Sequence, residues 1–449
     1  MKQVNLIIIG AGPGGYETAV KAAEAGLETV IIEARRPGGT CLNEGCIPTK
    51  CLCRNAEMLY DLREAAVYGI GELTYTFDIR QAVERKNQVV SSLITGIETL
   101  LRHPGITYVQ GKAEFAGDAH TLRVNGEEYT APNVIIATGS VTKYLPIGGA
   151  HLPGVLTSTE MLDLEHIPGR VCIVGGGVIG LEFASIFNAF GSQVTVVEFC
   201  KEVLPNFDSD IAKRLRQTLK SKGITFVTQA AVQAIRQADG NTCTVEYECK
   251  GKTVSIDADI VLMAVGRTAN LESLNLSDVG IATDRRGIVT DEHFTTCIPG
   301  VYAVGDVNGK CQLAHAATFQ SLHALNRILG KEDGIRMDII PAAVFTSPEA
   351  AMVGKTEQQC KEEGIGYTVH KGFFRANGKA MAMNETEGMV KIIADGNGKI
   401  LGCHMFGPHA ADLIQEITVL MQKDGTLTDL RDCIHAHPTL SEVIMNAAM

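Results

Sequence analysis

One pattern occurs twice in this chain and constrains its fold more than any other feature. Residues 4–33 read VNLIIIGAGPGGYETAVKAAEAGLETVIIE, and residues 171–198 read VCIVGGGVIGLEFASIFNAFGSQVTVVE. Each segment has a β-branched run, a G-x-G-x-x-G turn, a helical stretch, a second apolar run and a final glutamate. The first glycine and the glutamate are 23 residues apart in both segments. The chain therefore contains two separate β-α-β units.

This arrangement is typical of dinucleotide-binding folds, for reasons of backbone geometry. The first glycine makes a tight turn, the second lets a pyrophosphate approach the backbone, and the third lets the helix pack on the strand. The helix N-terminus then favours the anion, and the glutamate accepts a bond from a ribose hydroxyl. These residues are Gly10, Gly12, Gly15 and Glu33 in the first unit, and Gly175, Gly177, Gly180 and Glu198 in the second. We expect an α/β protein with two Rossmann-like domains.

Length and charge narrow the class of protein further. A chain of 449 residues exceeds the size of one hydrophobic core, so several domains are expected. The net charge of −11 opposes general nucleic-acid binding and would suit a basic protein partner. No apolar stretch approaches the roughly 18 residues of a membrane span. Thirteen cysteines, with no export signal apparent, predict a reducing, cytoplasmic location.

Other segments suggest how the domains follow one another. Three segments end a strand at glycine, where ligands meet a doubly wound sheet: IIATGS (135–140), VLMAVGR (261–267) and GVYAVGD (300–306). Residues 54–103 have helical periodicity and predict a long helical insertion. The pattern changes to α+β from about Asp338. We predict four parts: a first nucleotide domain (1–145), a second (146–270), a part completing the first nucleotide site (271–337) and a C-terminal interface domain (338–449).

Two cysteines follow the first unit in GGTCLNEGCIPTK (38–50). On a regular helix the Cα atoms of Cys41 and Cys46 would be about 8.7 Å apart. A disulfide needs less than about 7 Å, so pairing would require a helix break, which Gly45 and Pro48 allow. A strained, reducible disulfide is more often catalytic than structural. Two buried thiols, or a zinc site that adds Cys51 and Cys53, remain alternatives, although the spacing matches no usual zinc cluster.

Three segments carry a resemblance to a known family. GGTCLNEGCIPTK, ANGKAMAMNETEGMVKIIAD (376–395) and HAHPTLSE (435–442) resemble the pyridine nucleotide-disulfide oxidoreductases, in order and over essentially the whole chain. The resemblance implies a flavoprotein that reoxidises protein-bound dihydrolipoyl groups to lipoyl through a Cys41–Cys46 disulfide. It implies FAD on the first fold and NAD on the second. It also implies a homodimer with a shared active site and a lipoylated partner from a 2-oxoacid dehydrogenase or glycine-cleavage assembly.

The same resemblance assigns cofactor residues. TTCIPGVYAVGD (295–306) resembles the family's second FAD motif. The implied FAD contacts beyond the glycine turn are Glu33, Lys50, Ala113, Thr138, Gly139, Ser140, Asp306, Leu313, Ala314 and His315. The implied NAD contacts beyond the second turn are Glu182, Glu198 and Gly266, and Glu182 is also the implied ion-pair partner of Lys50. No arginine closely follows Glu198, which favours NAD over NADP. No metal site is expected.

The chain's end supplies a candidate acid–base pair. A histidine is the natural proton acceptor near a reacting thiol, and we expect Glu442 to orient His437 as a triad acid does. Pro438 predicts a helix start, with Glu442 about one turn in. Thr439 and Glu442 also match a capping box, which needs no chemistry. Cys433, His435 and His437 could instead face one way as metal ligands. The resemblance favours acid–base catalysis, with His437 supplied by the neighbouring subunit.

Some positions depart from the family pattern. Glu44 stands where an apolar residue is usual, and AATFQS (316–321) follows His315 where an acid and a glycine are usual. Glutathione-type reductases fit less well because Glu198 disfavours NADPH. A mercuric reductase fits poorly because the tail NAAM lacks paired cysteines. A binding subunit with incidental turnover is a further alternative, against which Cys41, Cys46, His437 and Glu442 argue.

Overall fold

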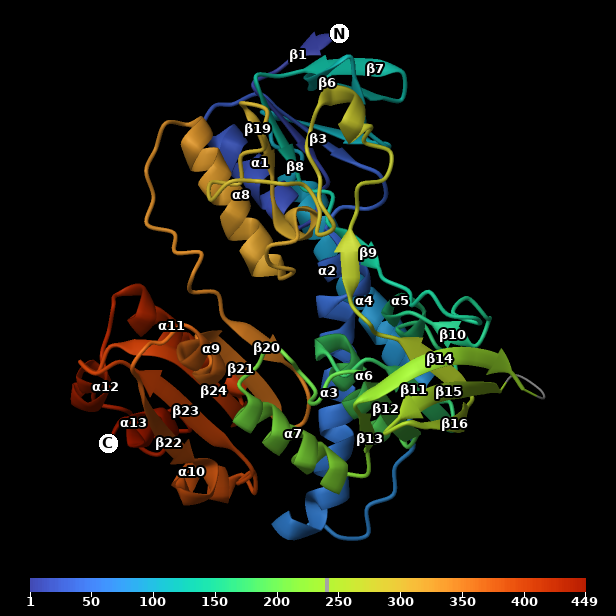
Figure 1. Ribbon diagram of the computed structural model, residues 1–449, viewed down its shortest axis with the longest axis vertical. Helices are drawn as coiled ribbons and strands as arrows, with labels where there is room; N and C mark the ends of the chain where they lie inside the picture. The colour runs from blue at the N-terminus through green and yellow to red at the C-terminus, as the bar shows by residue number, and fades with distance from the viewer. Residues whose placement is uncertain (239–241) are drawn as a thin grey trace. The chain divides into compact units, whose positions relative to one another are not determined.

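A computed structural model describes residues 1–238 and 242–449 of the chain. It contains two compact units, each assembled from three separate stretches of sequence (Figure 1). The first unit comprises 1–51, 83–143 and 266–337, and the second comprises 52–82, 144–265 and 338–449. The four predicted domain boundaries remain a prediction.

The first unit is organised around a parallel sheet in the order β19-β8-β2-β3-β4. Its strands are β2 (Leu6–Ile9), β3 (Thr29–Glu33), β4 (Ile106–Gln110), β8 (Asn133–Ile136) and β19 (Val301–Ala303). Its inner strands β8, β2 and β3 are largely apolar and buried, as expected of parallel strands covered on both faces. Helices α1 (Pro13–Glu24) and α8 (Ala314–Ile328) lie side by side against it (Figure 1). The predicted Rossmann-like fold of this unit is therefore confirmed.

Smaller elements complete the first unit. A four-stranded sheet has the order β1-β7-β6-β5, and a two-stranded ribbon pairs β9 with β18. The strands are β1 (Lys2–Gln3), β5 (Glu114–Ala116), β6 (Asp118–Val124), β7 (Glu127–Thr130), β9 (Ser140–Thr142) and β18 (Arg267–Ala269). The short helices are α2 (Gly39–Glu44), η2 (Leu276–Val279) and η3 (Gly305–Asn308).

The second unit contains its own parallel sheet in the order β10-β17-β11-β12-β13. The antiparallel strands β14, β15 and β16 form a separate sheet beside it. The strands are β10 (Val155–Leu156), β11 (Arg170–Val174), β12 (Gln193–Glu198), β13 (Thr225–Thr228), β14 (Ala230–Gln237), β15 (Cys243–Cys249), β16 (Lys252–Ala258) and β17 (Ile260–Met263). The helices are α5 (Ser158–Met161), α6 (Val178–Phe190) and α7 (Ser209–Ser221). The repeat seen in the sequence is thus a repeat in structure.

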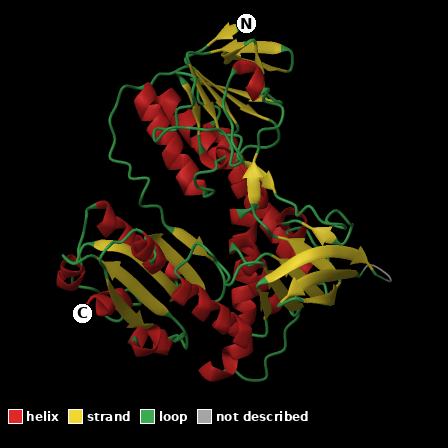
Figure 2. Ribbon diagram, viewed as in Figure 1, coloured by secondary structure: helices red, strands yellow, loops and turns green. Residues whose placement is uncertain are grey.

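The C-terminal part of the second unit is an antiparallel sheet with helices, as the change of pattern near Asp338 predicted (Figure 2). Its order is β20-β21-β24-β23-β22. The strands are β20 (Ala342–Val344), β21 (Glu349–Gly354), β22 (Thr368–Phe373), β23 (Met389–Ala394) and β24 (Ile400–Gly407). The helices are α9 (Glu357–Glu362), η4 (Phe374–Ala376), α10 (Gly378–Ala382), α11 (Ala410–Gln422), α12 (Leu427–Asp432) and α13 (Glu442–Ala448).

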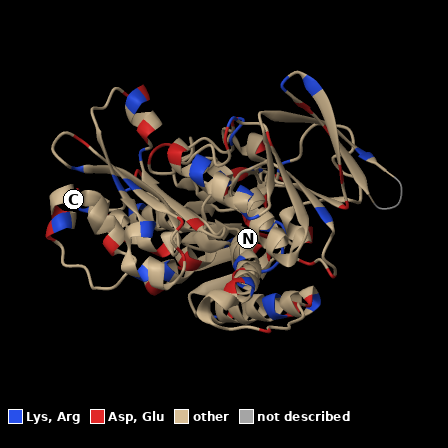
Figure 3. Cartoon of the chain, turned by 90° about the horizontal axis from the view of Figure 1, so that it is seen from below, with Lys and Arg blue, Asp and Glu red and all other residues tan. Residues whose placement is uncertain are grey.

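The predicted helical insertion over 54–103 is only partly right. Helix α3 (Cys46–Glu64) and the short η1 (Ala65–Tyr68) are separated from α4 (Ile79–Leu100) by a non-helical stretch. Gly69 and Gly71 lie in that stretch, and Gly69 ends η1 with a left-handed φ of 77°. Within the described ranges, no helix is both long and apolar enough to cross a membrane. Figure 3 shows Lys and Arg interspersed with Asp and Glu, in agreement with the many exposed ion pairs.

Candidate active site

The first glycine turn requires glycine at two of its three positions. Gly10 has a φ of 101°, and a Cβ there would collide with the carbonyl of Ala137. A Cβ on Gly15 would collide with the carbonyl of Gly10. The nearest atom to a Cβ on Gly12 would be 3.8 Å away, so the chain itself leaves this side of the turn open. That combination fits a turn built to receive a pyrophosphate at Gly12.

The second glycine turn repeats this geometry. Gly175 has a φ of 110° and faces the Ala264 carbonyl, while a Cβ on Gly180 would collide with Gly175. Nothing lies within 4 Å of the position a Cβ would take on Gly177. Helix α6 begins directly after Gly177, with no side chain capping its N-terminus. The helix N-terminus is thus available to an anion in this turn.

The two predicted ribose acids make equivalent hydrogen bonds. Glu33 accepts 2.8 Å bonds from the backbone N–H groups of Ala11 and Arg35. Glu198 accepts bonds from the N–H groups of Gly176 and Cys200, the latter at 2.6 Å. In both units the bonds join residues 22 and 2 positions apart. Each carboxylate therefore ties the end of its second strand to its own glycine turn.

The redox segment contains the helix break that a Cys41–Cys46 contact requires. Helix α2 ends at Glu44 and α3 begins at Cys46, with Gly45 between them at φ −142° and ψ −108°. A Cβ on Gly45 would lie 2.9 Å from the carbonyl oxygen of Thr40, so only glycine fits this close approach. The predicted interruption is confirmed.

Across this break the two thiols meet. Cys41 is partly exposed and Cys46 is exposed. A hydrogen bond with Cys46 and burial raise the pKa of the Cys41 thiol well above its ordinary value. The positive charge of the Lys50 ammonium acts in the opposite direction and lowers this pKa. When oxidised to a disulfide, an adjacent pair of this kind can exchange with an external dithiol.

The neighbouring cysteines belong to the helix core. Cys51 and Cys53 are buried in α3, and the Cys53 thiol donates to the Phe345 carbonyl at 3.3 Å. Among residues with described positions, no group of three or more His, Cys, Asp and Glu side chains could hold a metal ion. In the described parts of the chain, Cys41, Cys46, Cys51 and Cys53 therefore do not form the ligand cluster that a zinc site would need.

A partly buried polar cluster surrounds Asp306. Ser140 donates to Asp306 at 2.5 Å, and Arg267 Nε donates to Ser140 Oγ at 2.7 Å. Burial raises the pKa of the Asp306 carboxyl, while the Ser140 bond and the Arg267 charge oppose that rise. Sequence reasoning missed Arg267, although it directly follows the predicted residue Gly266. Its guanidinium, partly buried at the end of the β9–β18 ribbon, is suited to an anionic group of a nucleotide.

The unusual AATFQS segment supports the same cluster. Gln320 Oε1 accepts bonds from the Gly305 N–H at 2.8 Å and from Asn308 Nδ2 at 2.9 Å. Both donors belong to η3, which carries Asp306. Gln320 is 2% exposed, so this residue fixes the turn from the core side. The departure from the family pattern thus has a structural role in this chain.

The remaining predicted residues of the first site lie in the same unit. Ala113 is buried, and Thr138 Oγ1 donates to the Asn270 carbonyl at 2.8 Å. Gly139 has a φ of 72° with open space around it. Helix α8 begins at Ala314 after Leu313, which provides no side-chain cap, and His315 follows. The implied FAD residues Leu313, Ala314 and His315 thus stand at the start of α8.

Glu44, the other departure, forms an ion pair with Arg35. Arg35 Nη2 lies 2.5 Å from Glu44 Oε1, and the Glu44 side chain is 19% exposed. This interaction raises the pKa of Arg35. The glutamate therefore joins the redox segment to the loop after Glu33 and does not project freely into solvent.

His437 and Glu442 contact one another, although the local structure differs from the prediction. His437 Nδ1 lies 2.9 Å from Glu442 Oε1, and the imidazole side chain is 79% exposed. Pro438 does not begin the helix, because α13 starts only at Glu442, after Ser441. Glu442 is therefore the first helical residue and not one turn in. Its other oxygen accepts the Thr439 N–H at 2.8 Å, so half of the predicted capping box also forms.

Two further predicted residues lie in different units. Glu182, in α6, is 4% exposed and accepts the Phe345 N–H at 3.0 Å. Lys50, in α3, acts electrostatically on Cys41. Their mutual ion pair stays a prediction. His435, considered above as a metal ligand, instead has Nε2 2.7 Å from Glu416 Oε1, which supports a structural role.

Comparison with known proteins places this geometry in a family. Residues 4–321 match the family described as pyridine nucleotide-disulphide oxidoreductase, and residues 340–448 match its dimerisation domain. The chain is 39% identical to the mitochondrial dihydrolipoyl dehydrogenase of Pisum sativum, over 99% of this chain and 91% of that protein. It is 38% identical to the dihydrolipoyl dehydrogenase of Geobacillus stearothermophilus, over 99% and 96%.

A solved structure is also similar over the full length. The Cu(II) complex of the HOCl-induced flavoprotein disulfide reductase RclA from Escherichia coli has a TM-score of 0.88 and 32% identity, covering 100% of this chain and 99% of that one. The chain thus belongs to the pyridine nucleotide-disulphide oxidoreductase family. It is an oxidoreductase that uses a flavin and a pyridine nucleotide.

Proposed function

We propose that this protein is a dihydrolipoyl dehydrogenase, which oxidises protein-bound dihydrolipoyl groups and reduces NAD⁺. The overall reaction is dihydrolipoyl + NAD⁺ → lipoyl + NADH + H⁺. The observation that carries the proposal is the contact of Cys41 with Cys46 across the Gly45 break. The relatives that bear this name add support.

The residues present fit both cofactors. The open side of Gly12, the Asp306–Ser140–Arg267 cluster and Glu33 suit FAD in the first unit. The open side of Gly177, the uncapped α6 N-terminus and Glu198 suit NAD in the second. When bound, FAD would pass the electrons of the dithiol to NAD⁺. The Glu198 carboxylate, without a following arginine, would repel the 2′-phosphate of NADP.

The chain's own residues carry the thiol chemistry. His437, held by Glu442, takes the proton of one substrate thiol. The resulting thiolate attacks Cys41 in the oxidised enzyme, so a substrate–Cys41 bond forms while the Cys41–Cys46 bond breaks and Cys46 leaves as a thiolate. The second substrate thiol then displaces Cys41, which releases the lipoyl group. Lys50 favours the thiolate forms.

The assembly follows from the same assignment. We propose a homodimer formed through 340–448, in which His437 of one subunit serves the cysteines of the other. Its substrate would be a lipoyl group carried on an acyltransferase core or on a glycine-cleavage carrier protein, in the cytoplasm. The matching dimerisation domain supports the dimer.

An anaerobic titration tests the function. Dihydrolipoamide is added to the purified flavoprotein while the visible spectrum is followed, and NAD⁺ is then added. We expect a long-wavelength thiolate-to-flavin band that disappears as stoichiometric NADH forms. If NADH bleaches the flavin but dihydrolipoamide does nothing, the substrate assignment is wrong. A protein that cannot be loaded with FAD would contradict the assignment of the first site.

A further inference from the structure

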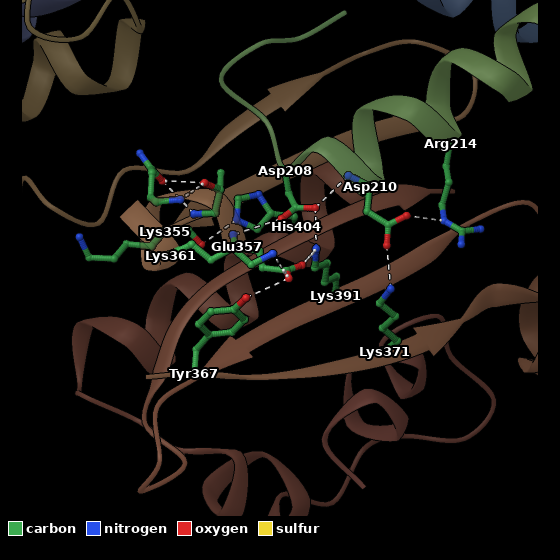
Figure 4. Close-up of polar contacts among 12 residues, drawn as sticks. Asp208, Asp210, Arg214, Lys355, Glu357, Lys361, Tyr367, Lys371, Lys391 and His404 are labelled. Atoms are coloured by element: carbon green, nitrogen blue, oxygen red, sulfur yellow. Dashed lines mark hydrogen bonds and ion pairs between the residues drawn. The ribbon is translucent and has the colours of Figure 1, made fainter. Parts of the chain in front are cut away.

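Three basic side chains form a row across the C-terminal sheet. Lys371 of β22 pairs with Lys391 of β23, which pairs with His404 of β24. Residues directly opposite one another on neighbouring strands project from the same face. The row lies against the first turn of α7, which carries Asp208 and Asp210 (Figure 4). A basic row thus meets an acidic helix start.

The centre of this row is a buried ion cluster. Lys391 Nζ lies 2.7 Å from Asp208 Oδ1 and 2.7 Å from Glu357 Oε2, and the Lys391 and Asp208 side chains are 1% and 2% exposed. Burial lowers the pKa of Lys391, but the hydrogen bonds to Asp208 and Glu357 raise it by more. The pKa of Lys391 is therefore above its ordinary value. Burial lowers the pKa of the adjacent His404, which favours its neutral form. The lysine is thus the cation that balances Asp208.

Asp208 also organises the start of α7. It is the N-cap of that helix and accepts the Asp210 N–H at 3.1 Å through the oxygen that Lys391 binds. Its second oxygen accepts the Glu357 N–H at 3.2 Å. One carboxylate therefore joins α7 to both β23 and α9.

The segment before α7 braces the second glycine turn. We call residues 199–208, between Glu198 and α7, the strap. The Leu204 N–H donates to the Gly176 carbonyl at 3.0 Å, and Val203 packs so closely on Gly176 that a Cβ there would lie 2.9 Å from Val203 Cγ1. Glu202 accepts two bonds from Arg216 of α7, at 2.6 and 2.9 Å. The strap thus contacts the glycine turn through Val203 and Leu204, and it contacts α7 through Glu202.

We infer that Lys391 is a positioning residue for pyridine nucleotide binding, because it fixes Asp208 and through it the strap beside Gly176 and Glu198. This inference rests on the proposed assignment of the second glycine turn to NAD. A buried ion pair often adds little stability compared with an apolar pair. The directed hydrogen bonds of Lys391, however, would hold Asp208 and the strap in one position, whereas apolar packing would allow several positions.

The test compares two lysine variants that contact the same helix. In Lys391→Met the buried partner of Asp208 is lost, and we expect the Kd for NAD⁺ of the oxidised holoenzyme to rise roughly tenfold or more. FAD content and the KM for dihydrolipoamide should change less than twofold. The control is Lys371→Met, which removes an exposed 2.7 Å pair with Asp210 on the same helix turn and should change the Kd less than twofold.

Two more variants separate the possible failures. The double variant Lys391→Met with Asp208→Asn leaves neither charge of this pair buried alone and keeps a helix-capping side chain. If the single variant Lys391→Met does not fold, the Kd for NAD⁺ is measured on this double variant instead. Unchanged NAD⁺ affinity in the folded variants overturns the inference. Glu198→Gln tests the site itself: if it weakens NAD⁺ binding while the lysine variants do not, only the role of Lys391 is wrong. If Glu198→Gln has no effect, the assignment of the second site is wrong.

Discussion

The imidazole of His437 contacts the carboxylate of Glu442, with 2.9 Å between Nδ1 and Oε1. The same carboxylate accepts the Thr439 N–H, and this bond, followed by the His437 contact, lowers the pKa of Glu442. Glu442 is therefore charged near neutral pH and is fixed by the backbone. Because Nδ1 faces Glu442, Nε2 is the nitrogen left for the proton transfer proposed above.

Replacing Glu442 tests this orientation. Glu442→Gln keeps an oxygen for Thr439 but loses the charge beside His437, so we expect kcat with dihydrolipoamide to fall roughly a hundredfold. Flavin reduction by NADH does not use this pair and serves as the internal control. Equal losses in both half-reactions would show that Glu442 acts on folding and not on proton transfer.

The cysteine pair gives a second prediction. In Cys41→Ser and Cys46→Ser no disulfide can form, so lipoyl turnover should fall to background while NADH still reduces the flavin. Cys53→Ser, in the same helix as Cys46 but buried against Phe345, should retain most activity. Steady-state rates with dihydrolipoamide and with an artificial acceptor distinguish these outcomes, and an active Cys41→Ser variant would exclude the mechanism.

Glu44 is predicted to matter little for stability. Its partner Arg35 has a side chain that is 66% exposed, and pairs of this kind contribute about 0–1 kcal/mol. Glu44→Val should therefore change the unfolding free energy by less than about 1 kcal/mol in urea titrations. A much larger loss would mean that the ion pair holds the redox segment in place, and Arg35→Met should then reproduce it.

Gln320 should matter for flavin retention. Gln320→Leu leaves the buried donors of Gly305 and Asn308 without their shared acceptor, at a cost of about 1–3 kcal/mol each. We expect weaker FAD binding, measured as flavin released on dilution, because both donors flank Asp306. Phe319→Leu is the matched control on the neighbouring, half-exposed position. Full FAD retention in Gln320→Leu would contradict the role assigned to this glutamine.

Glu357 predicts a pH dependence of stability. Bonds from Lys391 and Lys361 lower the pKa of Glu357 from 4.5 to about 2. A depressed carboxyl pKa stabilises the fold above the ordinary value, and that contribution is lost as the pH falls from 4.5 towards 2. Glu357→Gln should lower the Tm at pH 7 and reduce the fall in Tm between neutral and acid pH. Parallel Tm curves for the two proteins would argue against this account.

The local pattern was sufficient for much of the fold. Equal glycine-to-glutamate spacing predicted both β-α-β units, because tight turns and helix–strand packing depend on residues close in sequence. The same reasoning predicted the helix break near Gly45. It misplaced the start of α13, because Pro438 matches a helix N-terminus locally while the chain begins the helix only at Glu442.

The sequence by itself determined the two nucleotide folds, the spacing of Cys41 and Cys46 and the terminal His437–Glu442 motif, since each is encoded within a short segment. Only the tertiary structure decided that Arg267 joins Ser140 beside Asp306, that Gln320 supports that turn, and that Lys391 holds Asp208. These contacts join residues 127, 15 and 183 positions apart. Whether a charged side chain is solvated or buried against a partner depends on packing of distant segments, and no local pattern records it.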